Sequence, residues 1–318
     1  MIWEESQLVC VTACGMCGSS DLRSKGIRAD GLPLAECGGC GFVFLEKRPC
    51  PEAMAAYYDR TYFQNSDTYQ DYFSYARAVA QLGYCPRLHR LAPFIPDWRS
   101  KRVLEIGCAA GSTLALIQRQ GGIVEGIELS KTAAAVARDC FGLTVFNGPF
   151  EVAVLPSGTC DVVLMFDVLE HLAEPGLAID RVASVLRDGG ILALTVPNFD
   201  RYAAEGDGWP GIGSWFEHVN YFKSDVLCRH LADRGLVVLE HHTYTAGLDR
   251  KGRPESRALR AFKNRLKQRL PDFVFRAVRR VKFMIKGPPY LDVRQDQSGM
   301  DLFVLARKQA KNFPIAYP

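Results

Sequence analysis

Four cysteines in the first part of the chain have the spacing of metal ligands. Cys14 and Cys17 form one Cys-x-x-Cys pair, Cys37 and Cys40 form another, and 19 residues separate the pairs. A glycine directly follows each pair, where a tight turn lets backbone amides face the thiolates. Because four thiolates give Zn²⁺ a closed tetrahedral shell, the spacing predicts a structural zinc ribbon and not a catalytic metal.

A glycine-containing turn and a later acidic residue could hold a nucleotide-like ligand. Residues 103–106 have the pattern of a short buried strand, and Gly107-Cys-Ala-Ala-Gly111 leads from it into a helical pattern. Glycines at such a turn let a ligand approach the backbone. Glu128 comes 21 residues after Gly107, at the tip of the next strand, where a carboxylate can accept both hydroxyl protons of a ribose. A dinucleotide fingerprint would need glycines at 107, 109 and 112, which argues against NAD.

Two later segments carry residues that could remove a proton from a bound substrate. Residues 167–171 follow the predicted strand 161–166, and residues 214–222 follow the predicted strand 191–196. Both lie where the carboxyl ends of parallel strands place binding residues. The histidine, glutamate and tyrosine side chains in these segments are candidates for a general base, which accelerates a reaction by about 10²–10⁴.

A parallel sheet with crossover helices must position these residues, because short β-branched runs alternate with helical patterns from Arg102 onward. The predicted strands are 103–106, 123–129, 143–146, 161–166, 191–196, 236–241 and 302–306. The predicted helices are 112–120, 131–141, 175–186 and 224–234. The expected fold class is α/β, a doubly wound Rossmann-like sheet of seven strands with an N-terminal zinc ribbon and a helical insertion before the last strand.

Changes in composition along the chain indicate its organisation. Eight aromatic residues lie between 57 and 75, and residues 250–286 hold 14 Lys or Arg against 2 Asp or Glu. The predicted regions are a zinc ribbon (1–50), an aromatic helical cap (51–100), a cofactor-binding domain (101–248), a basic amphipathic helical insertion (249–292), and a last strand with a C-terminal tail (293–318).

Cysteine use and hydropathy predict a cytoplasmic protein. Six of the eleven cysteines precede residue 51, which favours metal ligation over disulfides, and either Cys10 or Cys50 could join the zinc site or stay unpaired. The first residues do not resemble a secretory signal, and no stretch has the roughly 18 apolar residues of a membrane span. Apolar residues at helical spacing within 250–290, flanked by positive charge, are compatible with a peripheral contact with an anionic membrane and equally with packing of these residues on the protein.

Four motifs, in the same order along residues 102–241, resemble those of class I S-adenosylmethionine-dependent methyltransferases. They are the segment 103–111, the acidic Glu128, the segment Asp167-Val-Leu-Glu-His-Leu, and Leu186-Arg-Asp-Gly-Gly-Ile-Leu. The departures are Ala109 at the usual middle glycine and Pro149 where many relatives place an aspartate. The resemblance implies S-adenosylmethionine as cofactor, with Asp167 near its methionine end and the adenine contacted by backbone and Phe150. It implies cofactor contacts from Glu105, Gly107, Ala109, Gly111, Glu128, Phe150 and Asp167.

A further resemblance concerns the acceptor side. Glu217-His218-x-x-Tyr221-Phe222 is similar to a segment of sugar C-methyltransferases, which also begin with a cysteine zinc site. The resemblance implies roles in proton abstraction for His218 and its neighbours, and the alternative is that His218 is a packed core histidine. The candidate catalytic residues are His218, Glu217, Tyr221, Asp167 and His171.

These observations predict a methyltransferase for a small-molecule or glycan substrate, with O-methylation of a sugar or lipid-linked glycan as the first hypothesis. C-methylation of a nucleotide-linked sugar is the alternative, and a non-catalytic cofactor-binding scaffold is a third. RNA methylation stays open because zinc ribbons also occur in some ribosomal-RNA methyltransferases. A nucleic-acid partner is nevertheless disfavoured, since the chain outside 250–286 carries 25 Lys or Arg against 33 Asp or Glu.

Overall fold

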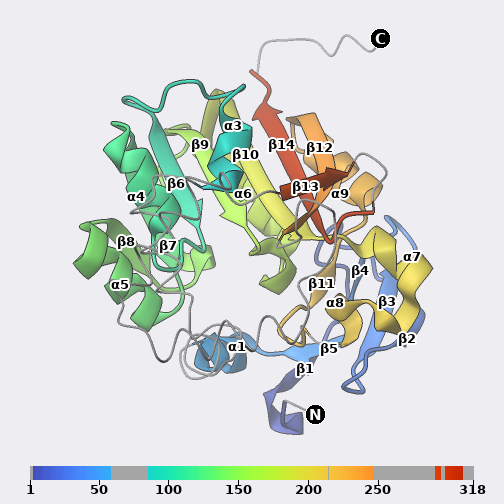
Figure 1. The fold of residues 1–318 in the computed structure, drawn as a ribbon. Coiled ribbons are helices and arrows are strands. Elements are labelled where there is room, and N and C mark those ends of the chain that lie inside the picture. The colour runs from blue at the N-terminus through green and yellow to red at the C-terminus, as the bar shows by residue number, and fades with distance from the viewer. Residues whose placement is uncertain (1–2, 59–84, 214, 247–290, 295–297, 311–318) are drawn as a thin grey trace, which may run out of the picture.

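A mixed eight-stranded sheet forms the centre of the computed structural model, which describes residues 3–58, 85–213, 215–246, 291–294 and 298–310 (Figure 1). Its strands run in the order β13 (Leu291–Arg294), β12 (Leu236–Ala246), β14 (Asp301–Lys308), β10 (Leu186–Pro197), β9 (Cys160–Phe166), β6 (Arg102–Ile106), β7 (Ile123–Glu128) and β8 (Thr144–Asn147). Strands β8, β7, β6, β9 and β10 are parallel, and β14 is antiparallel to both of its neighbours. All seven predicted strands and the doubly wound α/β class are confirmed, and β13 adds an eighth strand at one edge.

Helices cover both faces of this sheet because successive strand residues face opposite sides and both sides are apolar. Val103 of β6 packs with α3 (Pro86–Leu91), α4 (Ser112–Arg119) and α5 (Lys131–Phe141). Its neighbour Leu104 packs on the other face with α6 (Pro175–Val185) and α9 (Ser224–Ala232). The four predicted helices are therefore present, with ends that differ from the prediction by two residues or fewer.

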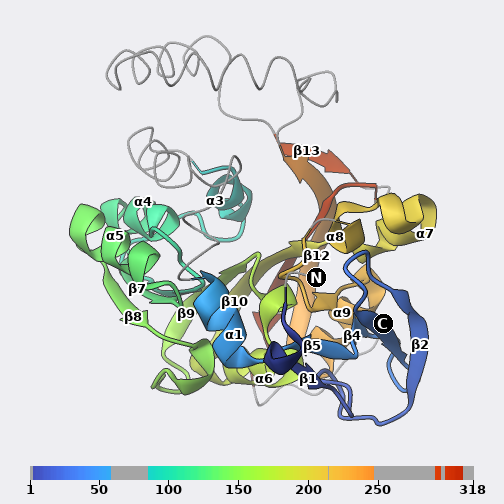
Figure 2. The same cartoon turned by 90° about the horizontal axis from the view of Figure 1, so that it is seen from below.

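The ribbon region is built from β1 (Leu8–Cys10), β2 (Leu22–Ile27), β3 (Pro33–Cys37), β4 (Val43–Leu45) and β5 (Lys47–Pro49). Strands β2, β3 and β4 form a sheet with β11 (Asn220–Tyr221), so a strand from the second half of the chain completes it (Figure 1). Figure 2 shows β4 of this sheet next to α9. Met16 and Phe42 of this region share a hydrophobic core with Val226 and Leu227 of α9. The ribbon is therefore packed on the α6 and α9 face of the central sheet.

A third hydrophobic core joins the ribbon to shorter elements. It contains Trp3, Met54 of α1 (Pro51–Tyr57), Trp209 and Tyr221. The remaining described helices are α7 (Tyr202–Glu205), α8 (Pro210–Gly213) and the 3-10 turns η1 (Glu5–Gln7), η3 (Phe150–Val152), η4 (Leu169–His171), η5 (Phe199–Arg201) and η6 (Gly206–Gly208).

Two predicted regions fall largely outside the described residues. The structure describes the aromatic cap at α1, Tyr58 and residues 85–100, while its segment 59–84 lies outside. Of the basic insertion, 249–290 lies outside, and its last two residues belong to β13. None of the described helices combines the length and hydropathy that crossing a membrane requires.

Candidate active site

The turn between β6 and α4 adopts the left-handed backbone that its glycines allow. Gly107 has φ 69° and Gly111 has φ 75°. A β-carbon at Gly107 would collide with Val168, and one at Gly111 with Leu143. Glycine is therefore required at both positions by packing as well as by backbone conformation.

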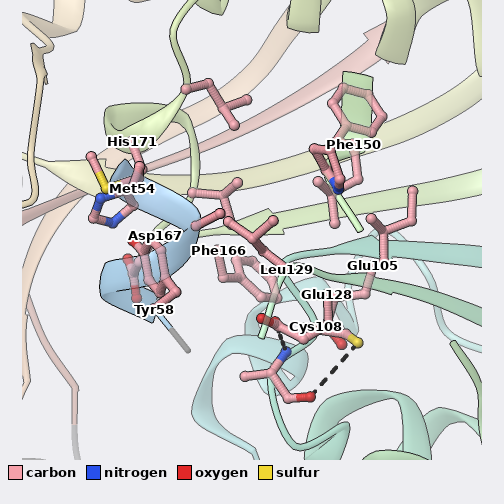
Figure 3. A pocket seen from close by; sticks show the side chains of 18 of the residues that line it. Met54, Tyr58, Glu105, Cys108, Glu128, Leu129, Phe150, Phe166, Asp167 and His171 are labelled. Carbon is pink, nitrogen blue, oxygen red and sulfur yellow. Dashed lines mark hydrogen bonds between the residues drawn. The ribbon is translucent and has the colours of Figure 1, made fainter. Parts of the chain in front are cut away.

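Ala109, which departs from the usual glycine, is also left-handed, with φ 47°. Its amide donates a hydrogen bond of 2.8 Å to Oε2 of Glu128. Glu128 is 6% exposed at the carboxyl end of β7, and its Oε1 accepts a second bond of 2.7 Å from the Ser130 amide. The carboxylate thus ties the glycine turn to the next strand and lies on the wall of a cavity (Figure 3).

That cavity has a volume of about 780 Å³, within the usual range of ligand pockets. The predicted cofactor residues Glu105, Gly107, Ala109, Glu128, Phe150 and Asp167 line it, and Gly111 is the residue just before the lining residue Ser112. The structure therefore brings the predicted cofactor residues together around one space.

A buried carboxyl group in this cavity fits a positively charged ligand. Glu105 is 4% exposed, and its Oε2 has no hydrogen-bond partner among the residues that the structure describes. Burial raises the pKa of Glu105 to about 8. A cationic group such as the sulfonium or amino group of S-adenosylmethionine would compensate this carboxylate, so the residues present fit the expected cofactor.

Polar residues from four elements gather at another part of the cavity wall. Asp167, left-handed with φ 57°, forms an ion pair with Arg87 of α3 and accepts a 2.6 Å hydrogen bond from Oγ1 of Thr195. Burial and the Asp167 charge raise the pKa of Asp301 to about 7. Burial also raises the pKa of the Tyr244 phenol. These polar residues surround Asp167, where the resemblance places the methionine end of the cofactor.

The two candidate histidines contact each other, but only His171 is among the described residues that line the cavity. Their ring centroids are 4.7 Å apart, and Nδ1 of His171 donates to the Glu217 carbonyl at 3.1 Å. Burial lowers the pKa of His171 to about 4, and burial together with His171 lowers the pKa of His218 well below its usual value. Both rings are therefore neutral at neutral pH.

The other two residues of the Glu-His-x-x-Tyr segment lie behind this wall. Burial raises the pKa of Glu217, and Tyr221 is 2% exposed in the core that contains Trp209. Neither lines the cavity in the described part of the chain. Their catalytic roles remain predictions. The Tyr221 hydroxyl donates a hydrogen bond of 3.3 Å to the His218 carbonyl.

The four ribbon cysteines converge as a metal site requires. Their sulfur atoms all lie within 4.8 Å of one another, with Cys14 and Cys40 at 3.8 Å and Cys17 and Cys37 at 3.6 Å. Tetrahedral Zn²⁺ with sulfur at about 2.3 Å sets sulfurs about 3.8 Å apart. The cluster therefore fits the zinc ion that the sequence predicts. Neither Cys10 nor Cys50 belongs to this cluster.

Several cavity residues escaped the sequence analysis. Met54 and Tyr58 approach His171 from α1 and the residue after it, and the Tyr58 ring lies 5.8 Å from the His171 ring (Figure 3). Arg48 also lines the cavity, and it donates to the Ala173 carbonyl at 2.6 Å. The aromatic composition after residue 50 hinted at α1, but a single arginine in a strand gave no signal.

Comparisons with known proteins identify the family of the chain and support its fold. The methyltransferase domain family matches residues 75–241, more than half of the chain, and the chain belongs to that family. A solved chain from the complex between the Haloferax volcanii Trm112 methyltransferase activator and a methyltransferase has a TM-score of 0.51 at 15% identity, covering 78% of this chain and 99% of that chain. That likeness supports the fold alone.

Two curated relatives are similar to part of the chain. A "Ubiquinone biosynthesis O-methyltransferase" of Aromatoleum aromaticum is 32% identical over 128 residues, 35% of this chain and 53% of the relative. A Mycobacterium tuberculosis protein named "Probable S-adenosylmethionine-dependent methyltransferase" is 29% identical over 145 residues, 45% of this chain and 51% of the relative. The chain thus spans about half the length of these relatives.

Proposed function

We propose that this protein transfers a methyl group from S-adenosylmethionine to a hydroxyl group of a small-molecule acceptor. The observation that carries the proposal is one cavity lined both by the glycine turn with Glu128 and by His171 with Tyr58. A cofactor on the first side would have its reactive end facing an acceptor on the second. Family membership supports the reaction class. We also propose the domain boundaries that the sequence analysis predicts.

Bound S-adenosylmethionine supplies a methyl group already activated by its positive sulfur. The protein's main task is then to hold the acceptor in line, which can contribute on the order of 7–11 kcal/mol. Met54, Tyr58 and Leu172 line the acceptor side of the cavity with largely apolar surface. Asp167 and Arg87, which also line the cavity, hold each other through an ion pair.

His171 is the residue best placed to take the acceptor's proton. Its Nδ1 donates to the Glu217 carbonyl, so Nε2 is the ring nitrogen that can accept a proton, and it lies 3.9 Å from Oε1 of Glu170. The ring is neutral at neutral pH because burial lowers the pKa of His171 to about 4. The charge of Asp167 favours the imidazolium that proton transfer creates.

Within this class, a sugar or lipid-linked glycan hydroxyl is the first acceptor hypothesis, supported by the Glu217-His218-x-x-Tyr221 resemblance. A phenolic hydroxyl is the second, favoured by the relative named for ubiquinone biosynthesis and by the largely apolar acceptor wall. A phenol also suits a base of low pKa, because its proton is more acidic than that of an alcohol. C-methylation of a nucleotide-linked sugar and RNA methylation are the alternative outcomes.

A label-transfer assay tests the proposal. The protein would be incubated with methyl-labelled S-adenosylmethionine and cell fractions separated into lipid, nucleotide-sugar, phenolic and RNA pools. We expect label in one small-molecule or lipid pool, a strong loss with His171→Ala, and no loss with His89→Ala, an exposed histidine of α3. Label confined to RNA, or none in any pool despite cofactor binding, would contradict the proposal.

A further inference from the structure

A buried arginine of the ribbon reaches the backbone that carries His218. Arg28, in the turn after β2, is 1% exposed and lies 190 residues from His218 in the sequence. Its Nη1 donates to the His218 carbonyl at 2.6 Å, and its Nη2 donates to the Phe216 carbonyl at 3.0 Å. Its Nη1 also lies 3.2 Å from the Tyr221 hydroxyl, which itself donates to the His218 carbonyl at 3.3 Å. One guanidinium therefore fixes three points of the segment 216–221.

The charge of Arg28 is compensated locally. Asp30 pairs with it at 2.7 Å, and both side chains are at most 3% exposed. Although burial opposes the charge, the Asp30 carboxylate raises the pKa of Arg28. The guanidinium carbon also lies 5.4 Å from the centre of the Phe216 ring. A planar fork with five donors can satisfy these partners together, whereas a lysine ammonium cannot reproduce that geometry.

The cysteine cluster is connected to the same segment through β4. Cys37 ends β3, Cys40 lies three residues before β4, and β4 pairs with β11 at Asn220 and Tyr221. The Leu45 amide donates to the Val219 carbonyl at 2.9 Å. The η4 turn holds the segment from the other side, since the Val219 amide donates to the Glu170 carbonyl at 2.9 Å. The segment therefore lies between the ribbon and the turn that carries His171.

We propose that Arg28 is a positioning residue for the acceptor side of the site, and that the ribbon with its metal extends this support. Arg28 fixes the His218 backbone, the His218 ring packs against His171, and His171 faces the cavity. The ribbon thus acts as part of the catalytic architecture and not as a separate attachment. The kinetic consequence rests on the proposed function, whereas the structural consequence does not.

Hydrogen exchange measured by mass spectrometry tests the structural consequence on the full zinc-bound chain. Arg28→Met should accelerate exchange in peptides covering 215–222 by about tenfold or more, because hydrogen bonds to a charged donor are lost. Arg28→Lys, which keeps the charge but not the fork, should show a smaller acceleration. Arg23→Met is the matched control, because Arg23 lies on β2 in an exposed ion pair with Asp21 and should leave these peptides unchanged.

Two further measurements separate positioning from general loosening of the fold. Calorimetry should give an S-adenosylmethionine affinity within about twofold of wild type for Arg28→Met, since the hydrogen-bond partners of the Arg28 side chain are Asp30 and residues of 216–221, not residues of 103–111. Removal of zinc by a chelator should accelerate exchange in 215–222 as well. Unchanged exchange in 215–222 in folded Arg28→Met, or equal acceleration across 103–106 and 162–166, would overturn the proposal.

Kinetics then address catalysis. With a working acceptor, Arg28→Met should lower kcat or raise the acceptor KM by about tenfold while the cofactor KM stays near its wild-type value. Arg28→Lys should recover part of that loss. Kinetic constants equal to those of the wild type in both variants, despite faster exchange in 215–222, would overturn the link to His171. Absence of methyl transfer by the wild-type protein would count against the proposed function, while the exchange result would still decide the role of Arg28.

Discussion

Ala109 shows how one side chain is accommodated where a glycine is expected. Its φ of 47° is left-handed, a conformation that costs a residue with a β-carbon roughly 1–2 kcal/mol. The hydrogen bond from its amide to Glu128 offsets part of that cost, because a bond to a carboxylate is stronger than a neutral one. The turn 107–111 therefore keeps its shape without a middle glycine.

Replacing Ala109 by glycine should stabilise the protein slightly. Relief of the left-handed strain exceeds the extra flexibility of glycine in the unfolded chain, so we expect a gain of about 0–1 kcal/mol in the free energy of unfolding. Chemical denaturation of both proteins measures it. Ala110→Gly, a neighbour without positive φ, should instead lose stability, and a loss at both positions would contradict the strain at Ala109.

Glu128→Gln should weaken S-adenosylmethionine binding. The substitution keeps the shape of the side chain but removes the charge that accepts the Ala109 and Ser130 amides, and it halves the capacity to accept ribose hydroxyls. We expect a loss of about 1.5–3 kcal/mol, roughly 10-fold to 100-fold in Kd, by calorimetry. Glu125→Gln, exposed on the same strand, is the control, and equal affinities for the two variants would refute the ribose assignment.

Glu105 should make the stability of the ligand-free protein depend on pH. Burial raises the pKa of Glu105 to about 8 from an ordinary value of 4.5, so the folded state binds more protons between these values. The stability that this extra proton binding gives the folded state is fully present below pH 4.5 and is lost as the pH rises through 8. Between pH 5 and 8, wild type should therefore lose more stability than Glu105→Gln, by on the order of a few kcal/mol. Denaturation curves at both pH values, with Glu125→Gln as control, measure the difference.

At the scale of elements, the two cysteine knuckles have matching backbones. The Cys14 and Cys37 amides donate to carbonyls five residues ahead, and the amides of Gly18 and Gly41 donate back to the Cys14 and Cys37 carbonyls. Gly18 and Gly41 have φ of 78° and 79°. The repeated geometry points the two thiolates of each knuckle toward one centre, as a single ion requires.

Metal analysis of the purified protein should therefore find one zinc per chain. Cys37→Ser should lose it, because three thiolates leave an open position in the shell, while Cys10→Ser should retain it, since Cys10 is exposed and outside the cluster. Chelation should destabilise the ribbon, because binding energy in such sites is folding energy. A full zinc content in Cys37→Ser would contradict the four-cysteine assignment.

The strands and the cofactor turn could be predicted because their signals are local. Short apolar runs that alternate with helical patterns predict the seven strands. The Gly107 turn and Glu128 each directly follow a predicted strand, which fixes their places relative to β6 and β7. The addition of β11 to the ribbon sheet could not be predicted, since two residues make no strand pattern. Arg28 and Arg87 were missed for a related reason: their roles come from partners distant in sequence, and only tertiary packing brings those partners together.

At the scale of the whole molecule, the cavity is assembled from parts that are distant in the sequence. The carboxyl ends of β6, β7 and β9 supply the side that we propose holds the cofactor, as expected for an open α/β sheet. Strand β5 of the ribbon region supplies Arg48, α1 supplies Met54, and α3 supplies Arg87. Variation in these attachments can therefore change the acceptor while the cofactor side stays constant, which is how one fold serves many reactions.

The basic segment 250–286 concerns the whole molecule's partner and lies outside the described residues, so its prediction comes from the sequence. Leu259, Phe262, Leu266 and Leu270 recur at helical spacing among basic residues. Such a segment is attracted to anionic lipid by about 1 kcal/mol per basic residue, which would bring the enzyme close to a lipid-linked acceptor. The alternative is that the apolar residues pack on the protein and the charges are solvated.

Vesicle flotation distinguishes these alternatives. The protein should float with anionic vesicles and not with neutral ones, because the attraction depends on surface charge. Phe262→Glu should abolish flotation, since it places a carboxylate among the apolar residues. Asn264→Glu makes the same change of charge away from them and should weaken flotation only modestly. Flotation by a variant lacking residues 250–290 at the wild-type level, or none by the wild type, would show that this segment does not bind membranes.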